Sequence, residues 1–194
     1  MIVLIDNGHG KETKGKRSPD GKLLESAWTR EVARMLVARL VDNGIEAQLV
    51  TPEDTDIILS ERVRRINAIC KARGASNVLV ISLHNNAATT TGAWGSARGF
   101  IPFIAPNAGA GSRRLARLLY DAAVAHGLKG NRWMPSQGYQ TKSLAICRDT
   151  KCAAVLTENL FMDNREDCAY LLTAEGKDNI VQAHLEAIQR YIFS

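Results

Sequence analysis

The chain has 194 residues, of which 45% are hydrophobic and 23% charged, the balance of an ordinary globular protein with one hydrophobic core. No apolar run approaches the roughly 18 residues of a membrane span, and the opening MIVLI meets Asp6 too early for a signal peptide, so no membrane insertion is expected. The formal charge of +5 suits an anionic polymer, but the basic residues are dispersed without interleaved aromatics, so nucleic acid is not the expected partner.

The first half of the chain alternates strand and helix patterns. IVLID at 2–6 is a short β-branched run that ends in NGHG, which predicts a buried strand followed by a loop. Apolar residues recur with helical spacing over 26–43, and 45–50 alternates like a strand. A second amphipathic helix is predicted over 58–74, with Ser60 as its N-cap.

The second half opens with the most strongly predicted strand, NVLVISLHNNA, whose near-continuous apolar run indicates burial on both faces. A loop without periodicity is predicted over 128–142. The remaining patterns predict strands at 97–105, 143–149 and 153–161, and helices at 112–127, 164–172 and 176–192.

This alternation predicts an α/β fold: a single domain over 1–194, with a mainly parallel twisted sheet of about six strands and helices on both faces. Such sheets bind their ligands at the carboxyl ends of the strands, where the connecting loops converge. The four cysteines form no C-x-x-C pair and are expected to be reduced and structural. We expect the protein to be a monomer.

The loop after the first strand has two possible functions. The stretch Gly10–Lys16 is one residue short of a Walker phosphate loop, and from Asp6 the same stretch presents an acid, a glycine and His9 where a strand ends. A Walker loop needs a Ser or Thr after its lysine and a helix that starts there. Arg17 occupies that position and the turn sequence SPDG follows, so the metal-binding interpretation is favoured.

Three further candidates fall where a parallel sheet would bring them near His9. Glu25 opens the first helix, His84 ends the central strand, and Glu158 ends the strand AVLTE. Two imidazoles and one carboxylate form a known catalytic zinc set that leaves a fourth position for water, and a second carboxylate nearby could take the proton of that water. The other two histidines, His126 and His184, are expected to be structural.

Six segments, in this order, closely resemble the zinc-dependent N-acetylmuramoyl-L-alanine amidases of the type 3 family: IVLIDNGHG, LLESAWTREVARML, DIILSERVRRIN, VISLHNNA, ARGF and AAVLTENLFMDN. The resemblance spans almost the whole chain. It implies that His9, Glu25 and His84 bind Zn²⁺, and that Glu158 is the catalytic glutamate. The chain departs from the family at Thr51-Pro52, where an Arg is usual, and in the lysine-rich loop after His9, where the family is rich in glycine.

The expected function is therefore hydrolysis of the amide between N-acetylmuramic acid and the L-alanine of the peptidoglycan stem peptide, by an autolysin or an endolysin. Peptidoglycan is the expected partner and the cell wall the expected place of action. With no signal peptide in this sequence, we expect cytoplasmic synthesis with release by another route, or a trimmed mature fragment. The alternatives are a phosphate- or nucleotide-binding enzyme that uses Gly10–Lys16, and a metal-free peptidoglycan-binding module.

Overall fold

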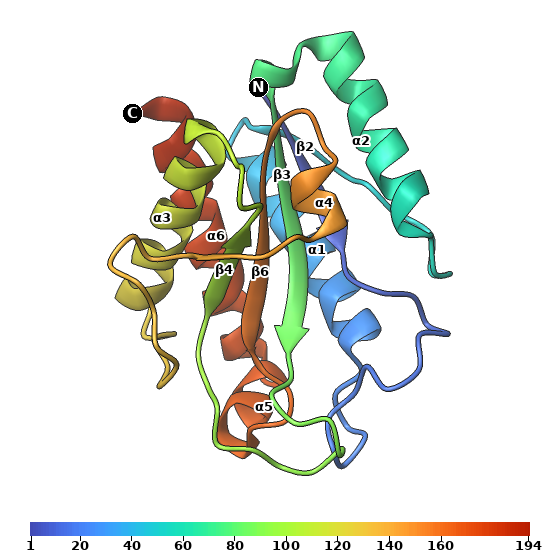
Figure 1. The fold of residues 1–194 in the computed structure, drawn as a ribbon, viewed down its shortest axis with the longest axis vertical. Helices are drawn as coiled ribbons and strands as arrows, with labels where there is room; N and C mark the ends of the chain where they lie inside the picture. The colour runs from blue at the N-terminus through green and yellow to red at the C-terminus, as the bar shows by residue number, and fades with distance from the viewer.

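A computed structural model covers residues 1–194 and shows one six-stranded sheet flanked by helices (Figure 1). The elements in chain order are β1 (Ile2–Asn7), α1 (Glu25–Asp42), β2 (Glu46–Leu49), α2 (Leu59–Arg73), a 3-10 turn (Ala75–Asn77), β3 (Val78–Asn86), β4 (Ile101–Ile104), α3 (Ala110–Ala125), β5 (Gln140–Thr141), α4 (Ala145–Arg148), β6 (Ala153–Phe161), α5 (Arg165–Leu171) and α6 (Ala174–Phe193). The strand order is β2-β1-β3-β6-β4-β5.

The sheet is mainly parallel, as predicted. Strand β1 pairs in parallel with both β2 and β3, and β3 pairs in parallel with β6. Strand β4 is the exception, since it runs antiparallel to β6, and the short β5 pairs in parallel with β4. The carboxyl ends of β1, β3 and β6 therefore meet at one edge, the lower edge of Figure 1.

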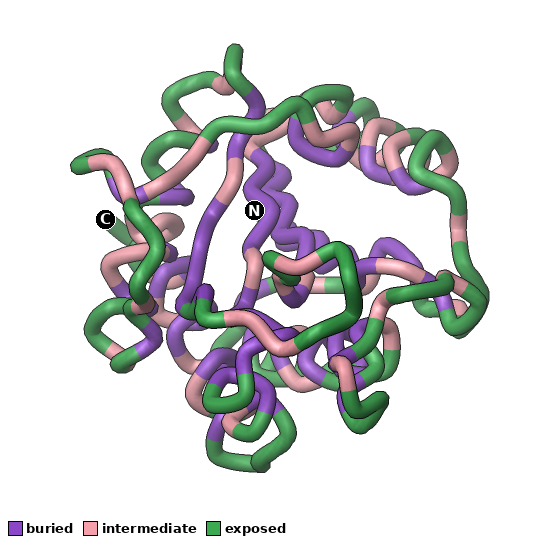
Figure 2. Tube along the Cα trace, turned by 60° about the horizontal axis from the view of Figure 1, so that its bottom comes forward, coloured by how far each residue is buried: buried purple, intermediate pink, exposed green.

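Both faces of the sheet are covered, because successive residues of a strand point to opposite faces. In β1, Val3 and Ile5 belong to a core of 31 buried residues with α1, α3, α5 and α6. Their neighbours Ile2 and Leu4 belong to a smaller core of nine buried residues on the opposite face, to which α2 and α4 contribute. Figure 2 shows these buried strands surrounded by more exposed segments. The prediction of helices on both faces is confirmed.

Three local predictions are wrong. The sequence predicts a strand over 143–149, but the structure has the short helix α4 there, and its Ile146 packs in the smaller core. Short apolar runs do not distinguish strand from helix by periodicity. Ser60 is not the cap of α2, which begins at Leu59 after Ile58 without a side-chain cap. The predicted loop over 128–142 contains the two-residue strand β5.

Two strands run past the candidate site residues that they carry, and β6 has the predicted bounds 153–161. Strand β3 continues past His84 to Asn86, and β6 continues past Glu158 to Phe161. Their pairing is irregular between His84 and Asn86, so the regular ladder ends where the site begins. All four cysteines are free thiols, and none of the helices is both long and apolar enough to cross a bilayer.

Candidate metal centre

Three of the predicted site residues converge from three different elements. His9 follows β1, Glu25 is the first residue of α1, and His84 lies near the end of β3. Their potential ligand atoms all lie within 4.8 Å of one another. Glu25 Oε1 is 3.1 Å from His84 Nδ1 and 3.4 Å from His9 Nε2, and the two imidazole rings meet edge to face with centroids 5.0 Å apart.

The backbone around His9 is shaped for this contact. His9 adopts a left-handed conformation, with φ of 60°, which is uncommon for a residue with a side chain. Gly8 must lack a side chain, because a Cβ atom there would lie 2.4 Å from Cε1 of the His84 ring. Two side chains of α1 hold the adjacent carbonyl groups: Thr29 Oγ1 donates to Gly8 O at 3.0 Å, and Arg30 Nη1 donates to His9 O at 2.8 Å.

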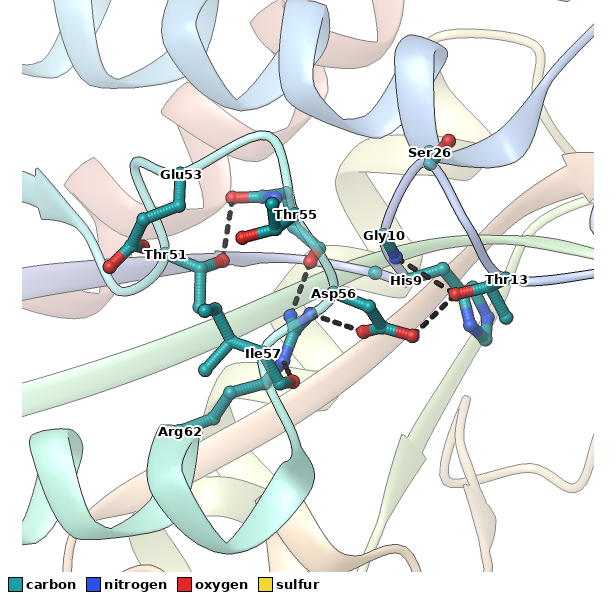
Figure 3. Close-up of polar contacts among 12 residues, drawn as sticks. His9, Gly10, Thr13, Ser26, Thr51, Glu53, Thr55, Asp56, Ile57 and Arg62 are labelled. Atoms are coloured by element: carbon teal, nitrogen blue, oxygen red, sulfur yellow. Dashed lines mark hydrogen bonds and ion pairs between the residues drawn. The ribbon is translucent and has the colours of Figure 1, made fainter.

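The loop after β2, at Asp56, forms hydrogen bonds with the residues that follow His9 (Figure 3). Thr13 Oγ1 accepts a hydrogen bond from Gly10 N at 3.0 Å and donates one to Asp56 Oδ2 at 2.5 Å. The Asp56 carboxylate also contacts Arg62 Nη2 at 3.5 Å. A Cβ atom on Gly10 would lie 2.2 Å from the Asp56 backbone, so the two segments pack against each other directly.

Arg62 of α2 forms hydrogen bonds with the end of β1. Its Nη1 donates to Asp6 Oδ1 at 2.8 Å and to Asn7 O at 2.5 Å, and both charged side chains are almost completely buried. Asp6 also accepts a hydrogen bond from Ser82 Oγ of β3, at 2.6 Å. Sequence reasoning missed Arg30 and Arg62. The only signal was that each arginine occupies a position on the buried face of its helix. That signal does not indicate which groups the arginine contacts.

Glu25 has the properties of a metal ligand. Its side chain is only 1% exposed, and Oε1 accepts a hydrogen bond from Asn85 N at 3.1 Å, whereas Oε2 is buried without a partner. Burial raises the pKa of Glu25, but hydrogen bonds with His84 and His9 outweigh burial and lower it to about 2. An ionised carboxylate with a free buried oxygen, beside two imidazoles, fits the donor set of a divalent metal.

Glu158 lies next to this group on the neighbouring strand. It is the direct partner of His84 in the β3–β6 register, and its Oε2 is buried without a hydrogen bond. Burial raises the pKa of Glu158 above its ordinary value, although the charges of His84 and Lys16 oppose the shift. For His84, burial lowers the pKa but the contact with Glu25 more than compensates, so the pKa is raised. His9, Glu25, His84 and Glu158 therefore lie close together in the structure.

The other two histidines are engaged elsewhere. His184 is buried between Thr157 Oγ1 and Ile180 O, and His126 contacts Asn179 and Glu186. Neither belongs to the cluster.

The structure does not favour a phosphate loop at Gly10–Lys16. The next helix begins only at Glu25, and the backbone N–H groups of Gly10, Lys11 and Thr13 already donate to protein acceptors. A phosphate loop uses such groups, at the start of a helix, to hold its ligand.

Known proteins are similar in sequence to this chain over nearly its whole length. An endolysin of Bacillus phage SPP1 is 27% identical over 96% of this chain and 64% of its own length. The N-acetylmuramoyl-L-alanine amidase CwlM of Bacillus licheniformis is 27% identical over 97% of this chain and 67% of its own length. The chain therefore spans about two thirds of these curated relatives.

Solved structures establish the fold. An N-acetylmuramoyl-L-alanine amidase from Clostridium difficile 630 matches with a TM-score of 0.84 at 22% identity, over 100% of this chain and 97% of that one. The catalytic domain of CwlV from Bacillus (Paenibacillus) polymyxa var. colistinus matches with a TM-score of 0.80 at 22% identity, over 98% and 97%. The sequence profile of the family described as N-acetylmuramoyl-L-alanine amidase matches residues 3–190. The chain therefore belongs to the N-acetylmuramoyl-L-alanine amidase family.

Proposed function

We propose that this protein is a zinc-dependent hydrolase that cleaves the amide bond between N-acetylmuramic acid and the L-alanine of the peptidoglycan stem peptide. The observation that carries the proposal is the group of His9, Glu25 and His84 within 4.8 Å, with Glu158 beside it on β6, in a chain of this family. The family is generally metal-dependent, and two imidazoles with one carboxylate are a donor set of catalytic zinc sites.

His9, Glu25 and His84 would hold the ion. When bound, zinc acts as a Lewis acid toward the amide carbonyl and lowers the pKa of a bound water to about 7. The chain contributes rigidity to this set, because Gly8 leaves room for the His84 ring and Arg30 fixes the His9 carbonyl. Ligands held in this way lose little conformational freedom when the metal and the substrate bind.

Glu158 moves the proton. Burial raises the pKa of Glu158 toward neutral pH. A group whose pKa lies near the working pH can both accept and return a proton. In the forward reaction Glu158 accepts a proton from the attacking water, whose oxygen forms a bond to the amide carbon. The C–N bond then breaks, Glu158 donates the proton to the alanine nitrogen, and the products are a lactyl carboxylate and a free amino terminus.

The biological setting is proposed on the same basis. Peptidoglycan is the partner, and the cell wall is the place of action. The relatives are named as an endolysin and as cell-wall and sporulation-specific amidases, so both phage lysis and wall remodelling are compatible with this catalytic unit. The monomeric state stays a prediction.

Digestion of purified peptidoglycan tests the proposal. We expect new free L-alanine amino termini, detected by mass analysis, together with intact glycan strands. A chelator should abolish their release, and added Zn²⁺ should restore it. Cleavage at a different bond, or release that persists in a chelator after the metal has been removed, would contradict the proposed reaction.

A further inference from the structure

A large cationic cavity adjoins the metal centre. It has a volume of about 610 Å³ and lies between the loop that follows His9 and the first turns of α1. Two carboxylates, Glu12 and Asp54, and six cationic side chains line it. The cationic side chains are Lys11, Lys14, Lys16, Arg17, Arg30 and Arg34.

Most of this positive charge has no partner within the protein. Asp54 is engaged by Arg34 at 3.3 Å and by Arg30 at 3.8 Å, and the Glu12 carboxylate accepts a hydrogen bond from Asp56 N. In contrast, the side chains of Lys11, Lys14, Lys16 and Arg17 form no ion pair and no hydrogen bond. The cavity therefore presents four free cations to any ligand that enters it.

The start of α1 adds to the positive potential. Leu24 precedes the helix and offers no side-chain cap, and Leu24, Ser26 and Ala27 all line the cavity. The first N–H groups of an 18-residue helix carry a partial positive charge, and here they lie beside the free lysines. Because Glu25 N and Ala27 N already donate to Lys16 O and Leu24 O, the cavity favours anions chiefly through its side chains.

The cavity lies next to a part of the reaction centre, because its lining includes Leu24 and Ser26, the residues on either side of Glu25. Glu25 N donates to Lys16 O at 3.0 Å, which ties the lysine-rich loop to the proposed metal ligand. Lys16 also lies close enough to Glu158 for its charge to lower the pKa of that carboxyl group. A ligand in the cavity would therefore lie near Glu25, on the side of the lysine-rich loop.

The length of the cavity suits a short extended peptide. Its lining residues on α1 run from Ser26 to Arg34, and at 1.5 Å per residue these eight steps correspond to roughly 12 Å. That is about the length of three to four residues of extended chain. A single small anion would fill only a part of it.

The chemistry of the substrate indicates which part enters. The amino sugars of the glycan strand are neutral, and the lactyl carboxyl group is consumed in the amide bond. The stem peptide, on the other side of the scissile bond, carries free carboxylates. Resting on the proposed function, we infer that the cavity between Lys11–Arg17 and α1 binds the carboxylates of the stem peptide, and so selects peptidoglycan whose stem peptides are not amidated.

Paired substrates test this inference. Two soluble muropeptides would be compared as substrates, one with free stem carboxylates and one with the same carboxylates amidated. The enzymes would be the wild type, the double variant Lys11→Gln/Lys14→Gln, and Lys71→Gln. Lys71 is an exposed and unpaired lysine on α2, away from the cavity, and serves as the matched control. Each rate would be measured as kcat/KM.

We expect the wild type to prefer the free acid by about tenfold, since two exposed charge contacts of about 0.7 kcal/mol each give that ratio. The double variant should lose most of this preference, and Lys71→Gln should keep it. Raising the ionic strength should reduce the wild-type preference, because exposed charges are screened. Equal hydrolysis of both substrates by the wild type overturns the inference while the proposed reaction stands.

A binding measurement distinguishes failure of the proposed reaction from failure of the inference about the cavity. If neither substrate is hydrolysed, the proposed reaction fails, and calorimetric titration of the free-acid stem peptide still tests the cavity. Binding that requires Lys11 and Lys14 supports the inference, and absence of binding overturns it. A glycerol-phosphate oligomer is titrated in parallel. Tighter, lysine-dependent binding of that oligomer would assign the cavity to a phosphate polymer and overturn the inference as well.

Discussion

Residues 6–10 and residues 11–17 are adjacent in the sequence but differ in how the protein holds them. In the first segment, the carbonyl groups of Asn7, Gly8 and His9 each accept a hydrogen bond from a side chain of α1 or α2. In the second, four cationic side chains have no partner, and most of its residues are exposed. The held segment is built for chemistry that requires fixed ligands, and the free segment for binding a charged substrate.

The difference follows from where each segment lies. The first leaves a buried strand, so its polar groups must find partners inside the protein. The second is a surface loop, whose lysines are solvated when no ligand is present. Fixed geometry costs conformational entropy, which buried contacts can offset and exposed lysines cannot.

Glu158→Gln, next to the ligands that the held segment helps to position, should have the largest effect. The amide cannot accept the water proton, so we expect turnover to fall by about 10²- to 10⁴-fold. The zinc content should remain that of the wild type, because Glu158 is outside the cluster of His9, Glu25 and His84. Turnover on peptidoglycan and metal analysis would be measured on the same sample. A variant with near wild-type turnover would exclude Glu158 as the base.

Arg62→Met tests how strongly the end of β1 is held. Removing Arg62 leaves the buried Asp6 carboxylate without its cation, which should cost about 3–5 kcal/mol of unfolding free energy. The control is Arg64→Met on the same helix, where the ion pair with Glu61 is exposed and its loss should cost no more than about 0.5 kcal/mol. Urea denaturation measures both. Equal losses would show that the buried pair does not stabilise this segment.

The pH dependence of stability tests whether His184 is held neutral beside the strand that carries Glu158. His184 contacts the adjacent Thr157, and burial lowers the pKa of His184 to about 4. Between pH 6.5 and 4 the unfolded chain binds this proton while the folded chain does not, so stability falls as the pH falls. The loss is about 3 kcal/mol across that window, at about 1.4 kcal/mol per pKa unit.

The measurement compares metal-free wild type with His184→Gln by urea denaturation at several pH values. The difference between the two profiles isolates His184 from the other histidines. A constant difference from pH 7 to pH 4 would show that His184 is not held neutral in the folded protein.

Lys14→Gln should have the smallest effect on the fold. Because Lys14 is exposed and has no ion pair, the free energy of unfolding should change by less than about 0.5 kcal/mol. Thermal and urea unfolding would show this. A loss of more than 1 kcal/mol would mean that the loop is part of the fixed scaffold, and the distinction between the two segments would disappear.

Much of the fold was predictable, because strands β1, β3 and β6 each contain an apolar run that is followed by polar residues. The proximity of His9, Glu25 and His84 follows from the parallel topology, since such strands end at a common edge. The contacts of Arg30 with His9 O and of Arg62 with Asn7 O could not be predicted, because these partners lie 21 and 55 residues away in the sequence. The short helix α4 was missed because four residues carry no periodicity.

Calorimetric titration of Zn²⁺ into the metal-free protein tests the central claim most directly, namely that three side chains from separate parts of the chain form one metal site. We expect the wild type and Glu158→Gln to bind one ion with equal affinity, and His84→Ala to bind at least about 100-fold more weakly. Circular dichroism would confirm that His84→Ala is folded. A wild type that binds no zinc, or a folded His84→Ala that binds it equally well, would contradict the account.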